Sequence, residues 1–159
     1  MSMTPINYNL VVKELSNGLV ALDSDEAQSL VLLPHVELSE FRTIRYGAGR
    51  QKGVTEHAIN MAAHHKGSVL ILVHHEALRN EAMRKFHAKA SGDGWLTVHC
   101  SYLPENWKQA TGSGLSGYEK FSLAIVDEAG FFFNKFSFDK IYRSLVDVVT
   151  PDVVIHLIN

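Results

Sequence analysis

Two stretches of the chain carry residues suited to phosphate chemistry, and the first is a glycine-rich turn. Residues 45–55 have the sequence Arg-Tyr-Gly-Ala-Gly-Arg-Gln-Lys-Gly-Val-Thr, and an alanine-rich helical pattern follows them. The N–H groups and dipole at the start of a helix favour an anion, and glycines let the backbone approach it closely. The turn therefore predicts a phosphate-binding loop. Its ending departs from the usual Gly-Lys-Ser/Thr, because Val54 stands at the lysine position and Lys52 lies two places earlier.

The second stretch is the acidic pair Asp127-Glu128, which directly follows the apolar residues 121–126. In nucleotide hydrolases one such acid holds Mg²⁺, and another orients or deprotonates the attacking water. We therefore expect Asp127 to be a metal residue, together with the hydroxyl of Thr55, and Glu128 to be the catalytic base. The alternative is a solvated strand end without function. The presence of the glycine-rich turn favours the functional interpretation.

The elements that must position these residues follow from the apolar pattern. Strands are expected at 42–46, 69–73, 95–100, 121–126 and 153–158. Helices are expected at 25–33, 54–65, 76–90 and 138–148. This alternation predicts an α/β fold with a mainly parallel sheet between layers of helices. Ligands of such sheets bind at the carboxyl ends of the strands, where both chemical stretches fall.

The whole chain of 159 residues is expected to form a single domain. Residues 41–159 would be the nucleotide-binding core, and residues 1–40 an N-terminal extension. Within the extension, residues 7–13 and 19–22 contain apolar runs that flank Ser16-Asn17-Gly18, which predicts a short β-hairpin. The helix at 25–33 is expected to end near Pro34.

Composition narrows the function classes. No apolar run approaches the roughly 20 residues that span a bilayer, and the N-terminus lacks the pattern of a signal peptide. The single cysteine, Cys100, suits a reducing compartment, so we expect a cytoplasmic protein without a membrane partner. The net charge of −2 means that any nucleic-acid contact must use a local basic patch.

Residues 50–55, Arg-Gln-Lys-Gly-Val-Thr, resemble the Arg-Gln-x-Gly-Lys-Thr phosphate loop of the ATPase domain of phage terminase large subunits, the motors that pump DNA into procapsids. Residues 126–131 are similar to that family's Asp-Glu-Ala-Ala-Phe segment. The resemblance covers about residues 42–159 and implies a RecA-like P-loop NTPase that uses ATP and Mg²⁺. It also implies double-stranded DNA, other packaging or replication proteins and further copies of the chain as partners. A viral protein of this kind would work in the host cytoplasm.

The resemblance further implies roles for individual residues. Arg50 would stabilise the γ-phosphate, and Lys52 would reach the phosphates in place of the lysine that Val54 replaces. With Glu128, these two residues are the catalytic candidates. The nucleotide-binding set implied in this way is Gly47, Gly49, Arg50, Gln51, Lys52, Gly53, Val54 and Thr55.

Two other functions fit the same features. The chain could be the first RecA-like domain of a helicase, which shares the sheet and an Asp-Glu-Ala motif but requires a second such domain. It could also be a degenerate P-loop fold that binds nucleotide without hydrolysing it and serves as a regulatory or protein-interaction module. Val54 in place of the loop lysine supports this third hypothesis.

Aromatic residues 131–133, three consecutive phenylalanines, follow the acidic pair. We expect them to pack in the core behind it, and a surface for a partner or an adenine base is the alternative. The nine histidines include no His-x₃-His pair on an expected helix, which disfavours a structural zinc site.

Overall fold

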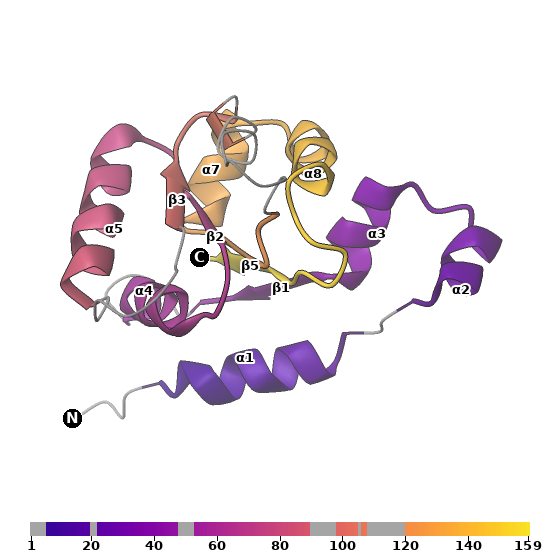
Figure 1. The fold of residues 1–159 in the computed structure, drawn as a ribbon, viewed down its shortest axis with the longest axis horizontal. Helices are drawn as coiled ribbons and strands as arrows, with labels where there is room; N and C mark the ends of the chain where they lie inside the picture. Colours follow the sequence, from indigo (N-terminus) through magenta and orange to yellow (C-terminus); the bar gives the residue numbers. More distant parts are fainter. Residues whose placement is uncertain (1–5, 20–21, 48–52, 90–97, 105, 108–119) are drawn as a thin grey trace.

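The computed structural model describes the chain except for residues 1–5, 20–21, 48–52, 90–97, 105 and 108–119 (Figure 1). Its centre is a five-stranded parallel sheet in the order β1-β5-β4-β2-β3. The strands are β1 (Thr43–Tyr46), β2 (Val69–Leu72), β3 (Val98–Ser101), β4 (Leu123–Val126) and β5 (Ile155–Ile158). The predicted α/β class and parallel sheet are therefore confirmed.

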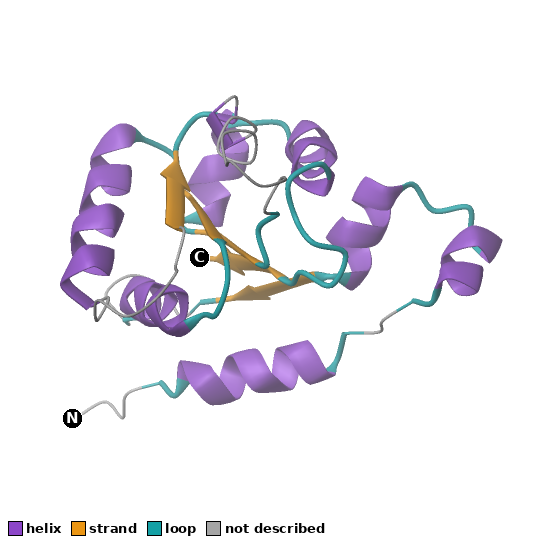
Figure 2. Cartoon of the chain, viewed as in Figure 1, coloured by secondary structure: helices purple, strands orange, loops and turns teal. Residues whose placement is uncertain are grey.

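The sheet is sandwiched between two layers of helices (Figure 2). On one face lie α1 (Tyr8–Asn17), α4 (Val54–His64) and α5 (Glu76–Lys89). On the other lie α3 (Pro34–Phe41), α7 (Ala129–Lys135) and α8 (Phe138–Val146). All four residues of β2, β4 and β5 are buried, because these inner strands are covered on both faces. Within the described ranges, no helix is both long and apolar enough to cross a membrane.

Side chains alternate between the two cores along each strand. In β4, Ala124 and Val126 pack with α7 and α8, whereas Leu123 and Ile125 face α4 and α5. The connection from β1 to β2 runs over one face through α4, and the connection from β4 to β5 runs over the other through α7 and α8. In parallel sheets, ligands bind at the carboxyl ends of the strands, at the point where the connections change from one face of the sheet to the other. In this sheet that position corresponds to the carboxyl ends of β1, β5 and β4.

The predicted N-terminal hairpin is wrong, because residues 8–17 form the helix α1. The side chain of Asn7 caps this helix by accepting a 3.3 Å hydrogen bond from the backbone N–H of Leu10. Tyr8 is buried on the sheet, with its ring stacked on His57 of α4 at 5.5 Å. Asn17 and Gly18 end the helix instead of forming a hairpin turn. Tertiary packing of Tyr8 thus favoured a helix over the local turn preference.

The segment between α1 and β1 also differs from its prediction. The expected helix at 25–33 is shorter, forming α2 (Ser24–Ser29), and Pro34 begins α3 instead of ending a helix. Proline suits the first turn of a helix, where its missing N–H is not needed. Between the two helices, Val31 adopts a left-handed conformation with φ of 52°. Such a conformation costs a β-branched residue on the order of 1–3 kcal/mol.

Candidate functional site

Four segments that are distant in sequence meet at the carboxyl edge of the sheet. Gly47 follows β1, Asn159 follows β5, Asp127 follows β4, and His74 lies just beyond β2. Because all the strands are parallel, these ends lie on one edge. The parallel sheet therefore gathers the polar residues that the sequence leaves far apart.

Thr55 and Asp127 are in direct contact across this edge. Thr55 lies in the first turn of α4, and its Oγ1 donates a 3.2 Å hydrogen bond to Oδ1 of Asp127. The backbone N–H of Glu128 donates to the same oxygen at 3.0 Å. The structure thus brings together the two residues predicted to hold a metal ion.

Asp127 is a buried carboxyl group with a shifted pKa. Its residue exposure is 8%. Burial raises its pKa above the ordinary value, and the nearby charge of Glu128 acts in the same direction. The hydrogen bonds from Thr55 and from the backbone of Glu128 oppose this rise without cancelling it. A cation at this position would favour the ionised form, because metal binding competes with the proton.

Glu128, the predicted catalytic base, has an unusual backbone conformation at the start of α7. Its φ and ψ are both 50°, which is the left-handed region, and its side chain is 38% exposed. Oε2 of Glu128 lies 3.3 Å from Nδ1 of His74, although the two atoms are not aligned for a hydrogen bond. Glu128 therefore reaches solvent beside the buried Asp127.

His74 was not among the predicted site residues. Its ring stacks on Phe131 with centroids 5.4 Å apart, and Nζ of Lys135 donates a 3.1 Å hydrogen bond to its carbonyl oxygen. One feature of the sequence could have identified His74 as a site residue: it directly follows the apolar run 69–73, where a parallel strand ends. Phe131 is 50% exposed, whereas Phe132 is buried, so the expected core packing of the three phenylalanines holds for Phe132 and not for Phe131.

Asn159 is a second residue of this edge that was not in the predicted set of site residues. Its backbone N–H donates to the carbonyl of Tyr46 at 3.2 Å, and its Oδ1 accepts a 2.9 Å hydrogen bond from the N–H of Gly130. A Cβ at Gly47 would overlap the carbonyl group of Asn159. Asn159 therefore links the turn after β1 to the start of α7. Glycine is required at position 47 for this close approach.

The turn before α4 is described at its ends. Gly53 is left-handed, with φ of 77°, and serves as the N-cap of α4. Val54, the first residue of α4, is 9% exposed, and its side chain packs in the core. Only its backbone is therefore available to a ligand at the start of the helix. The predicted site residues Gly49, Arg50, Gln51 and Lys52 lie outside the described residues.

A buried polar pair lies behind the site, on the side of α1 and α4. Oη of Tyr46 and Nδ1 of His156 are 3.2 Å apart, and both residues are buried. Burial, and then the charge of Asp127, raise the pKa of Tyr46. Burial, with smaller effects of His57 and His65, lowers the pKa of His156 to about 4. The imidazole of His156 is therefore neutral at neutral pH, and it shares one hydrogen bond with the phenol.

The described residues include no group of three or more histidine, cysteine, aspartate or glutamate side chains that could hold a metal ion. A Mg²⁺ site that binds phosphates requires fewer protein ligands. One or two carboxylates suffice there, because phosphate oxygens and waters supply the other ligands. Thr55 and Asp127 fit such a site, since both present oxygen atoms at the same point.

Comparison of the chain with protein-family models and with curated proteins finds no match. The geometry of the site is therefore the basis for its chemistry. That geometry combines a helix N-terminus, a hydroxyl bound to a buried carboxylate, and a solvent-accessible carboxylate on the next residue.

Proposed function

We propose that this chain binds ATP with Mg²⁺ at the carboxyl edge of its sheet and hydrolyses it, as a motor-type ATPase domain resembling that of terminases. The observation that carries this proposal is the hydrogen bond between Thr55 and Asp127. It joins a hydroxyl at a helix start to a carboxylate at a strand end. A hydroxyl from the phosphate loop and a strand-end aspartate are the protein ligands of Mg²⁺ in P-loop nucleotide hydrolases.

The phosphates would lie before the N-terminus of α4. The left-handed Gly53 opens this helix, and its first N–H groups point away from the helix body, where an anion is favoured. Arg50 and Lys52 are the proposed side-chain contacts to the phosphates. Bound Mg²⁺ would supply neutralisation of the phosphate charge, with Thr55 and Asp127 as its protein ligands.

Glu128 is the proposed general base. It follows Asp127 directly, and its side chain is partly exposed, so it can contact a water molecule beside the phosphates. Its carboxylate would orient this water and accept its proton. The ring of His74 lies beside Oε2 of Glu128, with its Nδ1 at 3.3 Å, which limits the directions in which the carboxylate can point.

One observation favours a second candidate function, nucleotide binding without hydrolysis. The position of the loop lysine is occupied by Val54, whose side chain is buried in the core. A phosphate contact of this kind stabilises the transition state by several kcal/mol in order of magnitude. A domain without it would serve as a nucleotide-dependent regulatory or interaction module.

Titration of the full chain with ATP, with and without Mg²⁺, tests both candidates, and turnover should also be measured with DNA present. The ATPase proposal predicts Mg²⁺-dependent binding and a loss of turnover by about 10²–10⁴-fold in Glu128→Gln, with binding retained. Glu14→Gln, an exposed position on α1, is the matched control. Turnover that survives Glu128→Gln rules out the base, binding without turnover supports the second candidate, and absence of binding refutes both.

A further inference from the structure

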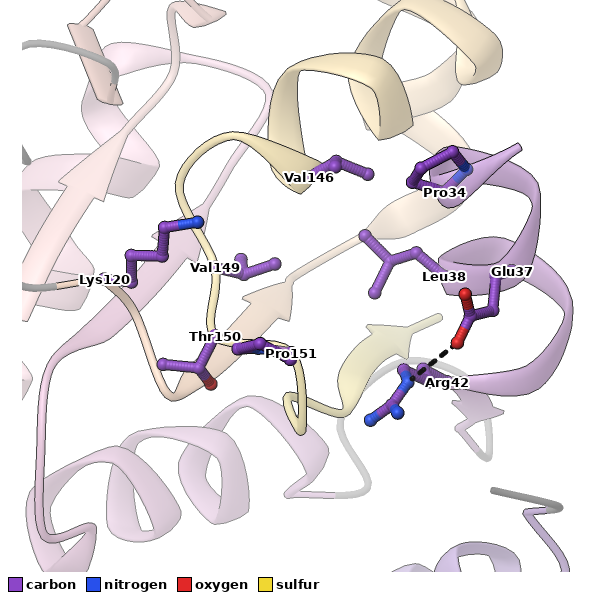
Figure 3. A pocket seen from close by; sticks show the side chains of 9 residues that line it. All are labelled: Pro34, Glu37, Leu38, Arg42, Lys120, Val146, Val149, Thr150 and Pro151. Carbon is purple, nitrogen blue, oxygen red and sulfur yellow. Dashed lines mark ion pairs between the residues drawn. The ribbon is translucent and has the colours of Figure 1, made fainter. Parts of the chain in front are cut away.

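A hollow of about 320 Å³ lies at the amino edge of the sheet, opposite the candidate nucleotide site. We name it the trough, and it is lined by Pro34, Glu37, Leu38, Arg42, Lys120, Val146, Val149, Thr150 and Pro151. Figure 3 shows the α3 side chains facing those that follow α8, with Lys120 at the far side. The trough therefore lies between two segments that are about 110 residues apart in sequence, as residues 34–42 and 146–151 are.

The trough is lined mainly by apolar side chains, with two cations among its lining residues. Leu38 and Val149 are buried in its floor. Arg42 is neutralised by Glu37, with 3.7 Å between Nε and Oε1. Lys120 is exposed, and among the described residues it has no ion pair. A complementary surface would be apolar and carry an acidic group at one end.

This chain itself presents such a surface. The connection between α2 and α3, which we name the corner, exposes Leu30, Val31 and Leu33 by 55%, 85% and 55%. The corner and α2 stand away from the body of the molecule (Figure 1). The acidic residues Asp23, Asp25 and Glu26 lie at the start of α2. Three large apolar side chains exposed beside a run of acids match the chemistry of the trough.

We propose that the corner of one copy docks in the trough of a second copy, and that the two copies exchange these contacts around a two-fold axis. The corner and the trough are adjacent on each chain, because Leu33 of the corner immediately precedes Pro34 of the trough. A two-fold interface requires such a self-complementary surface. In the dimer, Asp25 of one copy lies opposite Lys120 of the other. This inference does not depend on ATP binding.

Sedimentation of the full chain over a range of concentrations tests the dimer. We expect a reversible monomer–dimer equilibrium and a dissociation constant at least about tenfold higher in Val31→Asn. Asparagine tolerates the left-handed conformation at position 31, so this variant removes apolar surface without harming the fold. A chain that stays monomeric at all concentrations, or a dimer that Val31→Asn leaves unchanged, overturns the proposal.

A charge exchange tests the occupant of the trough. Lys120→Glu alone and Asp25→Lys alone should each weaken the dimer, and the two substitutions in one chain should restore it. Lys13→Glu, which makes the same charge change on an exposed position of α1, is the matched control and should have no effect. A mixture of the two single variants should also restore pairing, because in a mixed two-fold pair each of the two contacts again joins opposite charges. Absence of rescue in the double variant overturns the pairing of corner with trough.

Discussion

Gly47 and Asn159, which follow the hydrogen-bonded neighbours β1 and β5, approach so closely that a methyl group at position 47 would overlap the Asn159 carbonyl. The same Asn159 binds the N–H of Gly130 at the start of α7. The three segments that border the candidate site are therefore fixed relative to one another by contacts of the Asn159 backbone and side chain. This rigidity suits a site that must hold phosphate oxygens in place.

The two glycines that flank the turn should respond differently to alanine. Gly47→Ala forces β1 and β5 apart and should lower the free energy of unfolding by about 1–3 kcal/mol. At Gly53 a Cβ meets nothing within 4 Å, and the cost there arises from the φ of 77°. Gly53→Ala should therefore cost about 1 kcal/mol. Urea unfolding of both variants measures the difference, and equal losses would contradict the close approach at Gly47.

Thr55→Val should weaken binding of Mg²⁺ and nucleotide together. The substitution keeps the size of the side chain but removes the hydroxyl that binds Asp127. Loss of a hydrogen bond to a charged group corresponds to about a tenfold to hundredfold change in affinity. Thr55→Ser retains the hydroxyl and is the control. Calorimetry with and without Mg²⁺ distinguishes them, and equal affinity of the two variants would exclude Thr55 as a ligand.

Asp127→Asn should stabilise the fold at neutral pH while abolishing Mg²⁺-dependent binding. Burial raises the pKa of Asp127 in the folded chain, so ionisation is unfavourable there. The resulting loss of folding stability is absent at a pH below the ordinary carboxyl pKa of the unfolded chain. It is complete at a pH above the raised pKa of the folded chain. The gain in melting temperature should thus grow as the pH rises and vanish in acid. A gain that is independent of pH would contradict this cause.

His74→Phe should reduce turnover without changing nucleotide affinity. Phenylalanine can keep the stacking on Phe131 but removes the nitrogen that lies 3.3 Å from Glu128. Glu128 would lose a polar neighbour on one side, and kcat should fall by about two- to tenfold, as expected for one partly exposed polar contact. His87→Phe, at an exposed position of α5, is the control. A change in KM alone would show that His74 acts on binding and not on Glu128.

Stability should decrease when the pH falls from about 6.5 towards 4, partly through His156. Its folded pKa of about 4 lies below the ordinary value of 6.5, so the unfolded chain binds the proton more readily. The shift corresponds to roughly 3 kcal/mol lost across that window. His156→Gln, which can still accept from Tyr46, should flatten the dependence of unfolding on pH. An unchanged slope in this variant would exclude His156 as the cause.

Much of the sheet could be predicted because its inner strands are covered on both faces. A strand buried in this way is a continuous apolar run, and the runs at 69–73, 121–126 and 153–158 contain β2, β4 and β5. The positions of the acidic pair after β4 and of the helix start at Val54 could be predicted because local apolar patterns end or begin there. The two predicted metal residues, Thr55 and Asp127, were named from their strand-end and helix-start positions.

The sequence by itself determined the elements whose apolar periodicity is strong and local, together with the residue types at their ends. The tertiary structure alone decided that residues 8–17 are a helix, because Tyr8 is buried against α4 and β1. It also decided that β5 lies between β1 and β4, which brings Asn159 against Gly47, and that His74 meets Glu128. Strand order depends on contacts between distant segments, and those contacts have no local pattern in the sequence.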